Sequence, residues 1–445
     1  MGKNPNGKLQ NNMMRFFNGI IGSLLLISIT SYAQDWPEFR GPYGNGHATA
    51  DDAKPAGLPL HWSETENVKW KTPIPYRGLS TPVVMGPQVW LTTATEDGHD
   101  FYILCLDANT GQVQFNEKIF HSDHPERLGN NVNSYATPSP AIEPGRVYVH
   151  FGSYGTACLD TATCKPIWER TDLPCRHFRG PASSLILFEN LLILTMDGID
   201  VQYTVALDKK TGQTVWKTDR TTPWDDLGPD GQSKLAGDLR KSFCTPLIAE
   251  WNGNPIMISP GSKEVFTYDP RSGREIWKAW TGSINAAPRP VFSQGMFLFI
   301  TGQGKPELWA MKPDGQGDVA QSNVVWKSNK SIPKNASPVV VGDLLFMVND
   351  DGAISCLEVA TGNQLWKEMV GGPYTASPIY ADGRLYFFDQ KGVVTVIKPG
   401  RTYEVLASNT LETGGMASPA VSGKALFLRT KTHLYRIESS GPEVQ

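Results

Sequence analysis

The chain has 445 residues and a formal net charge of −3, with 19% charged residues. A charge this close to zero argues against a general affinity for nucleic acid or for anionic lipid. Short repeats run nearly to the end of the chain, so we expect one closed domain rather than several.

Residues 1–33 predict a cleavable signal peptide. Three basic residues precede an apolar stretch over residues 16–29, and small residues lead up to a cleavage site after Ala33. The stretch is interrupted by Gly and Ser and is too short for a membrane span. No Cys sits at the cleavage point, and the first in the chain is Cys105, so no lipid anchor is expected. We therefore expect an exported protein, periplasmic or secreted.

Eight copies of a short signal come next, and each predicts the start of a repeating unit. Most copies consist of a small residue or Cys, then Ser or Thr, then Pro, and a β-branched or apolar run comes after the Pro. The six clear copies and the two looser ones are Ser80-Thr81-Pro82, Ala136-Thr137-Pro138, Cys244-Thr245-Pro246, Ala336-Ser337-Pro338, Ala376-Ser377-Pro378 and Ala417-Ser418-Pro419, with Gly180-Pro181 and Ala287-Pro288.

A second signal closes most units. It reads Asp-x-x-(Thr or Ser)-Gly, as in Asp208 to Gly212, and an aromatic residue, here Trp216, stands four residues after the Gly. Asp bonds its own backbone and Gly adopts a positive φ, so the motif predicts a tight turn between two strands. The tryptophans that we expect to be largely buried between neighbouring units are Trp168, Trp216, Trp277, Trp326 and Trp366.

The length of a unit indicates its architecture. Pro338 and Pro378 are 40 positions apart, and Pro378 and Pro419 are 41 apart. Four short strands and three tight turns fill that length, as in one propeller blade. We therefore predict an all-β fold, an eight-bladed β-propeller of four-stranded antiparallel blades over residues 70–438. Segment 34–69 should pack on it, residues 67–73 should supply the last blade's fourth strand, and 439–445 form a tail.

These motifs resemble those of the PQQ-like (quinoprotein dehydrogenase-like) superfamily of eight-bladed propellers. The turn-and-Trp copies carry the resemblance, together with the opening Asp35-Trp36-Pro37-Glu38-Phe39-Arg40-Gly41-Pro42 and with Asn67-Val68-Lys69-Trp70. The resemblance covers about residues 35–438. It implies the fold rather than an activity, because one fold hosts many functions.

Six cysteines in an exported chain raise the question of disulfides. Cys105, Cys158 and Cys356 occupy a small strand position of the repeat, where a free Cys acts as a small apolar residue. Cys164 replaces the turn Gly and Cys175 lies in an inserted loop, so the sequence leaves a bridge between these two open.

Candidate ligand-binding residues lie just before the unit starts. In a propeller, the loops from the outermost strand of one blade to the innermost strand of the next converge on the central channel. Here they carry a basic, amide-rich and aromatic set: Arg77, Asn133, Tyr135, His177, Arg179, Lys241, Asn285, Lys334 and Tyr374. Arg and Lys suit a carboxylate or phosphate, Asn suits hydroxyls, and Tyr suits a sugar ring. A solvated channel rim would use the same residue types, and the sequence does not decide between the two.

His177 is the candidate catalytic residue if the protein is an enzyme, because a histidine beside Arg179 can transfer protons near neutral pH. No metal is expected. His121, Asp123, His124 and Glu126 lie in a long insertion, but their spacing matches no zinc or calcium loop.

Three functions stay open, and the residues do not settle whether the protein is an enzyme. The first is binding of a polar or anionic small molecule or a carbohydrate at the channel mouth, as in a carbohydrate-active enzyme. The second is a non-catalytic scaffold with a protein partner, similar to the propeller of the outer-membrane barrel-assembly machine. The third is a PQQ-dependent dehydrogenase. It is disfavoured, because the resemblance implies a vicinal Cys-Cys pair and a Glu, Asn and Asp calcium set that the chain does not present. We therefore expect no cofactor, neither PQQ nor calcium.

Overall fold

A computed structural model describes residues 1–2, 35–49, 57–130 and 132–439. The expected signal peptide lies almost entirely outside the described residues. The chain divides into two units, residues 1–32 and 33–445, and all the strands belong to the second. Among the described residues, no helix is long and apolar enough to cross a membrane.

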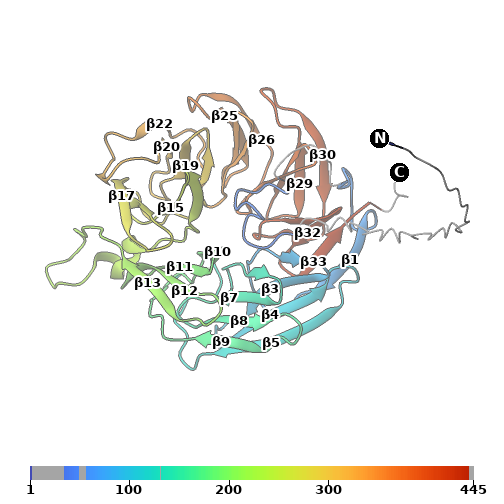
Figure 1. Ribbon diagram of the computed structural model, residues 1–445, viewed down its shortest axis with the longest axis horizontal. Coiled ribbons are helices and arrows are strands. Elements are labelled where there is room, and N and C mark those ends of the chain that lie inside the picture. Colours follow the sequence, from blue (N-terminus) through green and yellow to red (C-terminus); the bar gives the residue numbers. More distant parts are fainter. Residues whose placement is uncertain (3–34, 50–56, 131, 440–445) are drawn as a thin grey trace, which may run out of the picture. The chain divides into compact units, whose positions relative to one another are not determined.

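Eight antiparallel sheets follow one another in chain order around a ring (Figure 1), so the predicted eight-bladed β-propeller is confirmed. Blades 1 to 4 consist of β2 (Val83–Met85), β3 (Gln88–Ala94), β4 (Asp100–Asp107) and β5 (Val113–His121); β6 (Ala141–Glu143), β7 (Arg146–His150), β8 (Thr156–Asp160) and β9 (Pro166–Arg170); β10 (Ile186–Phe188), β11 (Leu191–Asp197), β12 (Gln202–Asp208) and β13 (Thr214–Asp219); and β14 (Leu247–Trp251), β15 (Asn254–Pro260), β16 (Glu264–Tyr268) and β17 (Glu275–Trp280). Blades 5 to 8 consist of β18 (Val291–Ser293), β19 (Met296–Ile300), β20 (Leu308–Met311) and β22 (Val324–Ser328); β23 (Val339–Val341), β24 (Leu344–Val348), β25 (Ala353–Glu358) and β26 (Gln364–Met369); β27 (Ile379–Ala381), β28 (Arg384–Phe388), β29 (Val393–Ile397) and β30 (Val405–Thr410); and β31 (Ala420–Ser422), β32 (Ala425–Arg429), β33 (His433–Ile437) and β1 (Val68–Pro73).

The ring closes between the two ends of the propeller. β1 pairs antiparallel with β33, so that Val68 lies opposite Ile437 and Pro73 lies opposite His433. The expected closure by residues 67–73 is confirmed, and the strand begins at Val68. Because β1 is contributed from the start of the propeller, blade 8 has four strands like most of the others.

Blade 4 departs from the prediction because it has a fifth strand. β21 (Gly317–Asp318) lies in the insert between β20 and β22 and pairs in parallel with Trp277 and Lys278 of β17. The insert before blade 4 carries a 3-10 helix, η1 (Lys234–Arg240). We call residues 224–240, which contain η1, the strap.

The repeat tryptophans tie each blade to the next. Trp216 of blade 3 donates its indole N–H to the carbonyl of Pro270 in blade 4 at 3.1 Å and packs on Gly273, where a Cβ would lie 2.4 Å from the ring. The same kind of bond, at 2.7–3.0 Å, joins the following blade to Trp70, Trp168, Trp277, Trp326 and Trp366. Six of the eight contacts between neighbouring blades therefore contain the same hydrogen bond, from a tryptophan indole to a backbone carbonyl.

The prediction that these five rings are largely buried is confirmed only in part. Trp216 and Trp277 are buried. Trp168, Trp326 and Trp366 are half-buried.

No disulfide joins the cysteines. All six are free and buried. Cys164 packs with the apolar side chains between blades 1 and 2, whereas Cys175 packs with Leu173 and Tyr203 in blade 3. The bridge that the sequence left open between Cys164 and Cys175 is therefore not formed.

The segment before β1 packs on the inner strands. Trp36 pairs with Val84 of β2, and the carbonyl of Pro37 accepts the N–H of Ile142 in β6 at 2.9 Å. Further on, Gly46 and Ala48 bond the backbone of Tyr380 in β27. Residues 35–49 therefore connect blades 1, 2 and 7.

Replacing Trp277 by Ala should lower the free energy of unfolding by about 3–5 kcal/mol, because a fully buried aromatic ring is lost from a packed interface. Urea denaturation followed by circular dichroism measures the change. Trp280 stands on the same strand and is 40% exposed, so Trp280→Ala is the control and should cost about 0.5 kcal/mol or less. Equal losses for both variants would contradict the role assigned to Trp277.

Deleting residues 34–75 should abolish cooperative unfolding, because the edge of β33 would lose its partner. Calorimetry of the shortened chain tests this expectation. A single transition at the wild-type temperature would show that the ring does not depend on β1.

Candidate ligand site in the propeller channel

A cavity of about 390 Å³ lies at the start of the innermost strands, where all eight blades meet. Its lining is made of hydroxyl, amide and apolar side chains with one charged residue, Arg179: Phe39, Leu79, Thr81, Asn130, Val132, Asn133, Thr137, Ser139, Arg179, Ala182, Ser184, Phe243, Thr245, Ala287, Gln303, Asn335, Thr375, Ser377, Met416 and Ser418. This volume falls in the range of small-molecule pockets, about 300–1,000 Å³.

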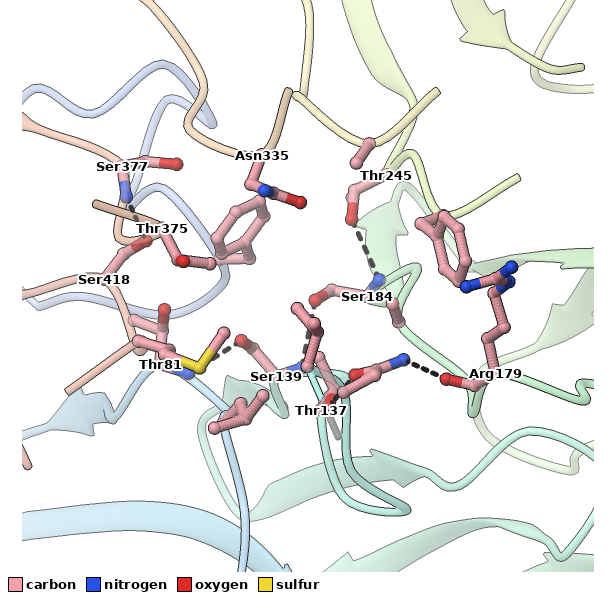
Figure 2. A pocket seen from close by; sticks show the side chains of 18 of the residues that line it. Thr81, Thr137, Ser139, Arg179, Ser184, Thr245, Asn335, Thr375, Ser377 and Ser418 are labelled. Carbon is pink, nitrogen blue, oxygen red and sulfur yellow. Dashed lines mark hydrogen bonds between the residues drawn. The ribbon is translucent and has the colours of Figure 1, made fainter. Parts of the chain in front are cut away.

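A chain of hydrogen bonds between blades builds the wall of this cavity (Figure 2). The backbone N–H of Thr81 donates to the hydroxyl of Ser139, that of Ser139 donates to Ser184, and that of Ser184 donates to Thr245, each at 2.9 Å. On the other side of the ring, Arg289 donates in the same way to Ser337, Ser337 to Ser377, and Ser377 to Ser418, again at 2.9 Å.

These bonds leave each hydroxyl with its own proton. A hydroxyl oxygen that accepts one N–H still has one donor and one lone pair to offer. In the described part of the chain, no protein group accepts these protons from Ser139, Ser184, Thr245, Ser377 or Ser418. The wall can therefore donate several hydrogen bonds to oxygen atoms of a ligand.

Arg289 interrupts the hydroxyl series at blade 5. Its Nε donates to the carbonyl of Pro246 at 3.0 Å, and its Nη1 donates to the carboxylate of Glu38 at 2.9 Å. Arg289 also bonds the carbonyl of Phe39, whose side chain lines the cavity. The N-terminal segment is therefore anchored at the break in the series.

Two of the predicted site residues line the cavity. The side-chain amide of Asn133 donates to the carbonyls of Arg179 and Pro181 at 2.9 and 3.2 Å. The guanidinium of Arg179 donates two bonds of 2.6 Å to the carboxylate of Asp238 in η1. That pairing raises the pKa of Arg179. It also occupies the N–H groups with which Arg179 was expected to bind an anionic ligand.

His177 and Lys241 lie together behind the cavity wall, with Lys241 Nζ 3.3 Å from His177 Nδ1. The other five predicted residues do not line the cavity. Tyr135, Asn285 and Tyr374 are buried, Arg77 is half-buried, and Lys334 is exposed.

Several lining residues were not proposed as site residues, although they belong to motifs that are visible in the sequence. Most of the hydroxyl residues are the Ser or Thr before the Pro of the unit-start motif, whereas Ser184 lies three positions after Pro181. Phe39 belongs to the opening motif. At blade 2 the hydroxyl of the series is Ser139, two positions after the Thr137 of the predicted anchor.

Among the described residues, no group of three or more His, Cys, Asp or Glu side chains could hold a metal ion. In the insertion, the His121 ring bonds Asp100 at 2.7 Å and Asp123 at 3.2 Å.

The lining of the cavity does not suit PQQ with calcium, the pair of cofactors that the fold implies. Calcium takes oxygen ligands and favours carboxylates. No Asp or Glu stands among the described lining residues, and the one cationic side chain there is paired with Asp238. The residues of this channel therefore do not fit that pair of cofactors.

Fold and cavity together define an eight-bladed propeller with a hydroxyl-lined channel. A family model described as "Outer membrane protein assembly factor BamB" matches residues 103–314 and 202–444. The chain therefore belongs to this PQQ-like family. A search of curated proteins found no match.

Solved structures share the fold at low sequence identity. BamB from Moraxella catarrhalis has a TM-score of 0.55 at 11% identity, over 83% of this chain and 99% of that chain. A europium-containing methanol dehydrogenase has a TM-score of 0.64 at 10% identity, over 89% of each chain. Quinohemoprotein alcohol dehydrogenase ADHIIG from Pseudomonas putida HK5 has a TM-score of 0.57 at 13% identity, over 93% and 82%. At these identities the likeness shows the fold alone.

The buried histidines behind the wall predict acid sensitivity. Burial lowers the pKa of His150 to about 4, from 6.5 in an exposed residue. Because the folded pKa is depressed, the unfolded chain takes up this proton first. Stability is therefore full above pH 6.5 and falls by about 1.4 kcal/mol per pH unit between pH 6.5 and 4.

His150→Asn removes this contribution and keeps a partner for Thr156, which lies 2.8 Å from Nδ1. The difference in unfolding free energy between wild type and variant should be constant from pH 7 to 8 and should narrow below pH 6.5. Urea denaturation at several pH values measures it. A difference that stays constant down to pH 4.5 would contradict the prediction.

Proposed function

We propose that the propeller binds a neutral, polyhydroxylated small molecule, such as a carbohydrate, in its channel. The single observation that carries this proposal is the lining of the cavity. Hydroxyl and amide groups surround it, and its one charged residue is already paired. Sugar hydroxyls both donate and accept hydrogen bonds, so they match Ser, Thr, Asn and Gln side chains. Phe39 and Phe243 add apolar ring faces on which a sugar ring can pack.

This proposal is narrower than the sequence suggested. The basic residues expected at the channel mouth would favour an anionic ligand. Lys241 instead lies behind the wall, Lys334 points to solvent, and Arg179 is held by Asp238. Without a free cation on the described lining, neutral ligands are favoured over carboxylates and phosphates.

A second candidate function is a non-catalytic scaffold in outer-membrane protein assembly. The family description and the fold shared with Moraxella BamB favour it. A scaffold would bind a protein partner on its surface and would not need a ligand in the channel. With either function, we propose that the protein is exported and that residues 1–33 are removed as a signal peptide.

Thermal melting with a panel of ligands tests the proposal. Neutral mono- and disaccharides should raise the melting temperature, since a ligand at 100 times its Kd adds about 2.7 kcal/mol of stability. Uronic acids should bind no better than the matching neutral sugars. Stabilisation by PQQ with calcium alone would contradict the proposal, and no stabilisation by any sugar would favour the scaffold.

Gln303→Ala should weaken sugar binding by about 0.5–1.5 kcal/mol, or roughly two- to tenfold in Kd, through the loss of one hydrogen-bonding amide from the lining. Isothermal titration calorimetry with the best sugar of the panel measures the effect. Gln213→Ala, at an exposed turn of blade 3, is the control and should bind as wild type does. Unchanged binding by Gln303→Ala would remove this side of the cavity from the site.

A further inference from the structure

A second cluster of reactive side chains lies beside the channel, between blades 2, 3 and 4. His150, His177, Ser183, Thr195 and Lys241 surround one small space, and Ala182 lines both this space and the channel cavity. The side chains of His177 and Lys241 are buried. The cluster does not depend on which ligand the channel holds.

The hydrogen bonds around His177 fix the position of its proton. The backbone N–H of Ser153 points at Nε2 and donates to it at 3.2 Å. Nε2 must therefore be the unprotonated nitrogen, and the ring proton sits on Nδ1. Nδ1 lies 3.3 Å from Nζ of Lys241, closer than the 3.8 Å that separates it from the Cys175 sulfur.

This arrangement requires an uncharged lysine. An ammonium group has only donors, so its N–H groups and the N–H of Nδ1 would face each other with no acceptor between them. A neutral amine has a lone pair that accepts the Nδ1 proton, and it keeps an N–H for the carbonyl of Asp197 at 3.1 Å.

No carboxylate is available to hold a charge on Lys241 among the residues that the structure describes around it. The nearest candidate, Asp197, is bound through both oxygens to Arg220 at 2.7 and 2.9 Å. Burial lowers the pKa of Lys241 and outweighs the attraction of Cys175, Asp197, Glu126 and Asp238. Burial lowers the pKa of His177 well below its ordinary value.

Two hydroxyls beside the amine lack a partner. Ser183 Oγ and Thr195 Oγ1 are buried, and neither has a hydrogen bond within the described part of the protein. Buried hydroxyls are nearly always bonded, so unsatisfied ones at one site need an explanation. Both line the space that holds Lys241. That space has no room for a water molecule in this structure, so the two hydroxyls can donate to a ligand oxygen only once it opens.

We propose that Lys241 is a nucleophilic amine that captures small carbonyl compounds as an imine. Its lone pair attacks the carbonyl carbon, and the C=O pair moves to the oxygen, toward the hydroxyls of Ser183 and Thr195. The two amine protons leave with that oxygen as water, and a C=N bond to Nζ remains. An aldehyde and the amine therefore give one imine and one water, with no oxidant or reductant. His177 acts as a positioning residue that keeps the lone pair of Nζ unprotonated.

The strap ends at the residue before Lys241. Lys241 directly follows η1, in which Leu235, Ala236 and Gly237 have φ values of 50°, 53° and 82°. Two of these three are not glycine, so the backbone there is strained. Asp238 of the same turn is held by Arg179 at the channel wall. The space around Lys241 is closed in this structure, so we expect a carbonyl compound to reach Nζ only after the residues around it move apart.

Reductive trapping tests the proposal on the full-length protein. The folded protein is treated with glyceraldehyde and sodium cyanoborohydride from pH 6 to 8, and peptide mass spectrometry measures the modification at each lysine. Exposed lysines have a pKa of about 10.4, so their labelling should fall about 100-fold from pH 8 to pH 6. Labelling of Lys241 should change less than about threefold and should exceed that of every other lysine at pH 6.

Two results would overturn the proposal. One is a Lys241 that stays unmodified in the folded protein while exposed lysines react. The other is a pH dependence at Lys241 that parallels the exposed lysines. Lys241→Met should abolish the pH 6 label, and Lys334→Met, at the matching loop position before blade 6, should keep it. Because the decisive readout is made on the wild-type chain, a variant that fails to fold does not affect the conclusion.

Discussion

The structure depends on one interaction, the hydrogen bond from a backbone N–H at the start of one blade to the hydroxyl of the next. Six such bonds of 2.9 Å join neighbouring inner strands. The outer rim is tied separately, by indole N–H groups that reach the following blade. Because each inner bond uses one lone pair of the hydroxyl oxygen and spares its proton, the hydroxyls that join neighbouring blades also form the polar wall of the channel.

The break in this series explains the opening motif. At blade 5 a hydroxyl is replaced by Arg289, which cannot accept an N–H. Its guanidinium instead bonds Pro246, Glu38 and the carbonyl of Phe39. Arg40, also buried, bonds Asn45 and the carbonyls of Pro338 and Pro378. Two buried arginines, Arg289 and Arg40, thus hold the segment that brings Phe39 to the cavity. The replacement of a hydroxyl by Arg289 at blade 5 is therefore linked to the opening motif, which that arginine binds.

The sequence predicted the fold well because both repeat signals have local physical causes. Turn residues set φ, and the tryptophan needs a glycine to pack on. The site was predicted less well, since loop position fixes a residue to one face but not the direction of its side chain. In an extended segment, neighbours point opposite ways. Lys334 is exposed whereas Asn335 lines the cavity, and Tyr374 is buried whereas Thr375 lines it. The pairing of Arg179 with Asp238, 59 positions away, could not be read from spacing at all.

The ring hydroxyls serve the fold, so their presence alone does not identify a ligand. Bonds of this kind join neighbouring blades whether the propeller binds a ligand or only scaffolds other proteins. What the closing of the ring does not require is the rest of the lining, such as the amide of Gln303 and the ring of Phe243. A channel without a ligand could carry any small or apolar residue at those positions. The case for a sugar-binding channel therefore depends on these side chains, which close no ring and tie no blade.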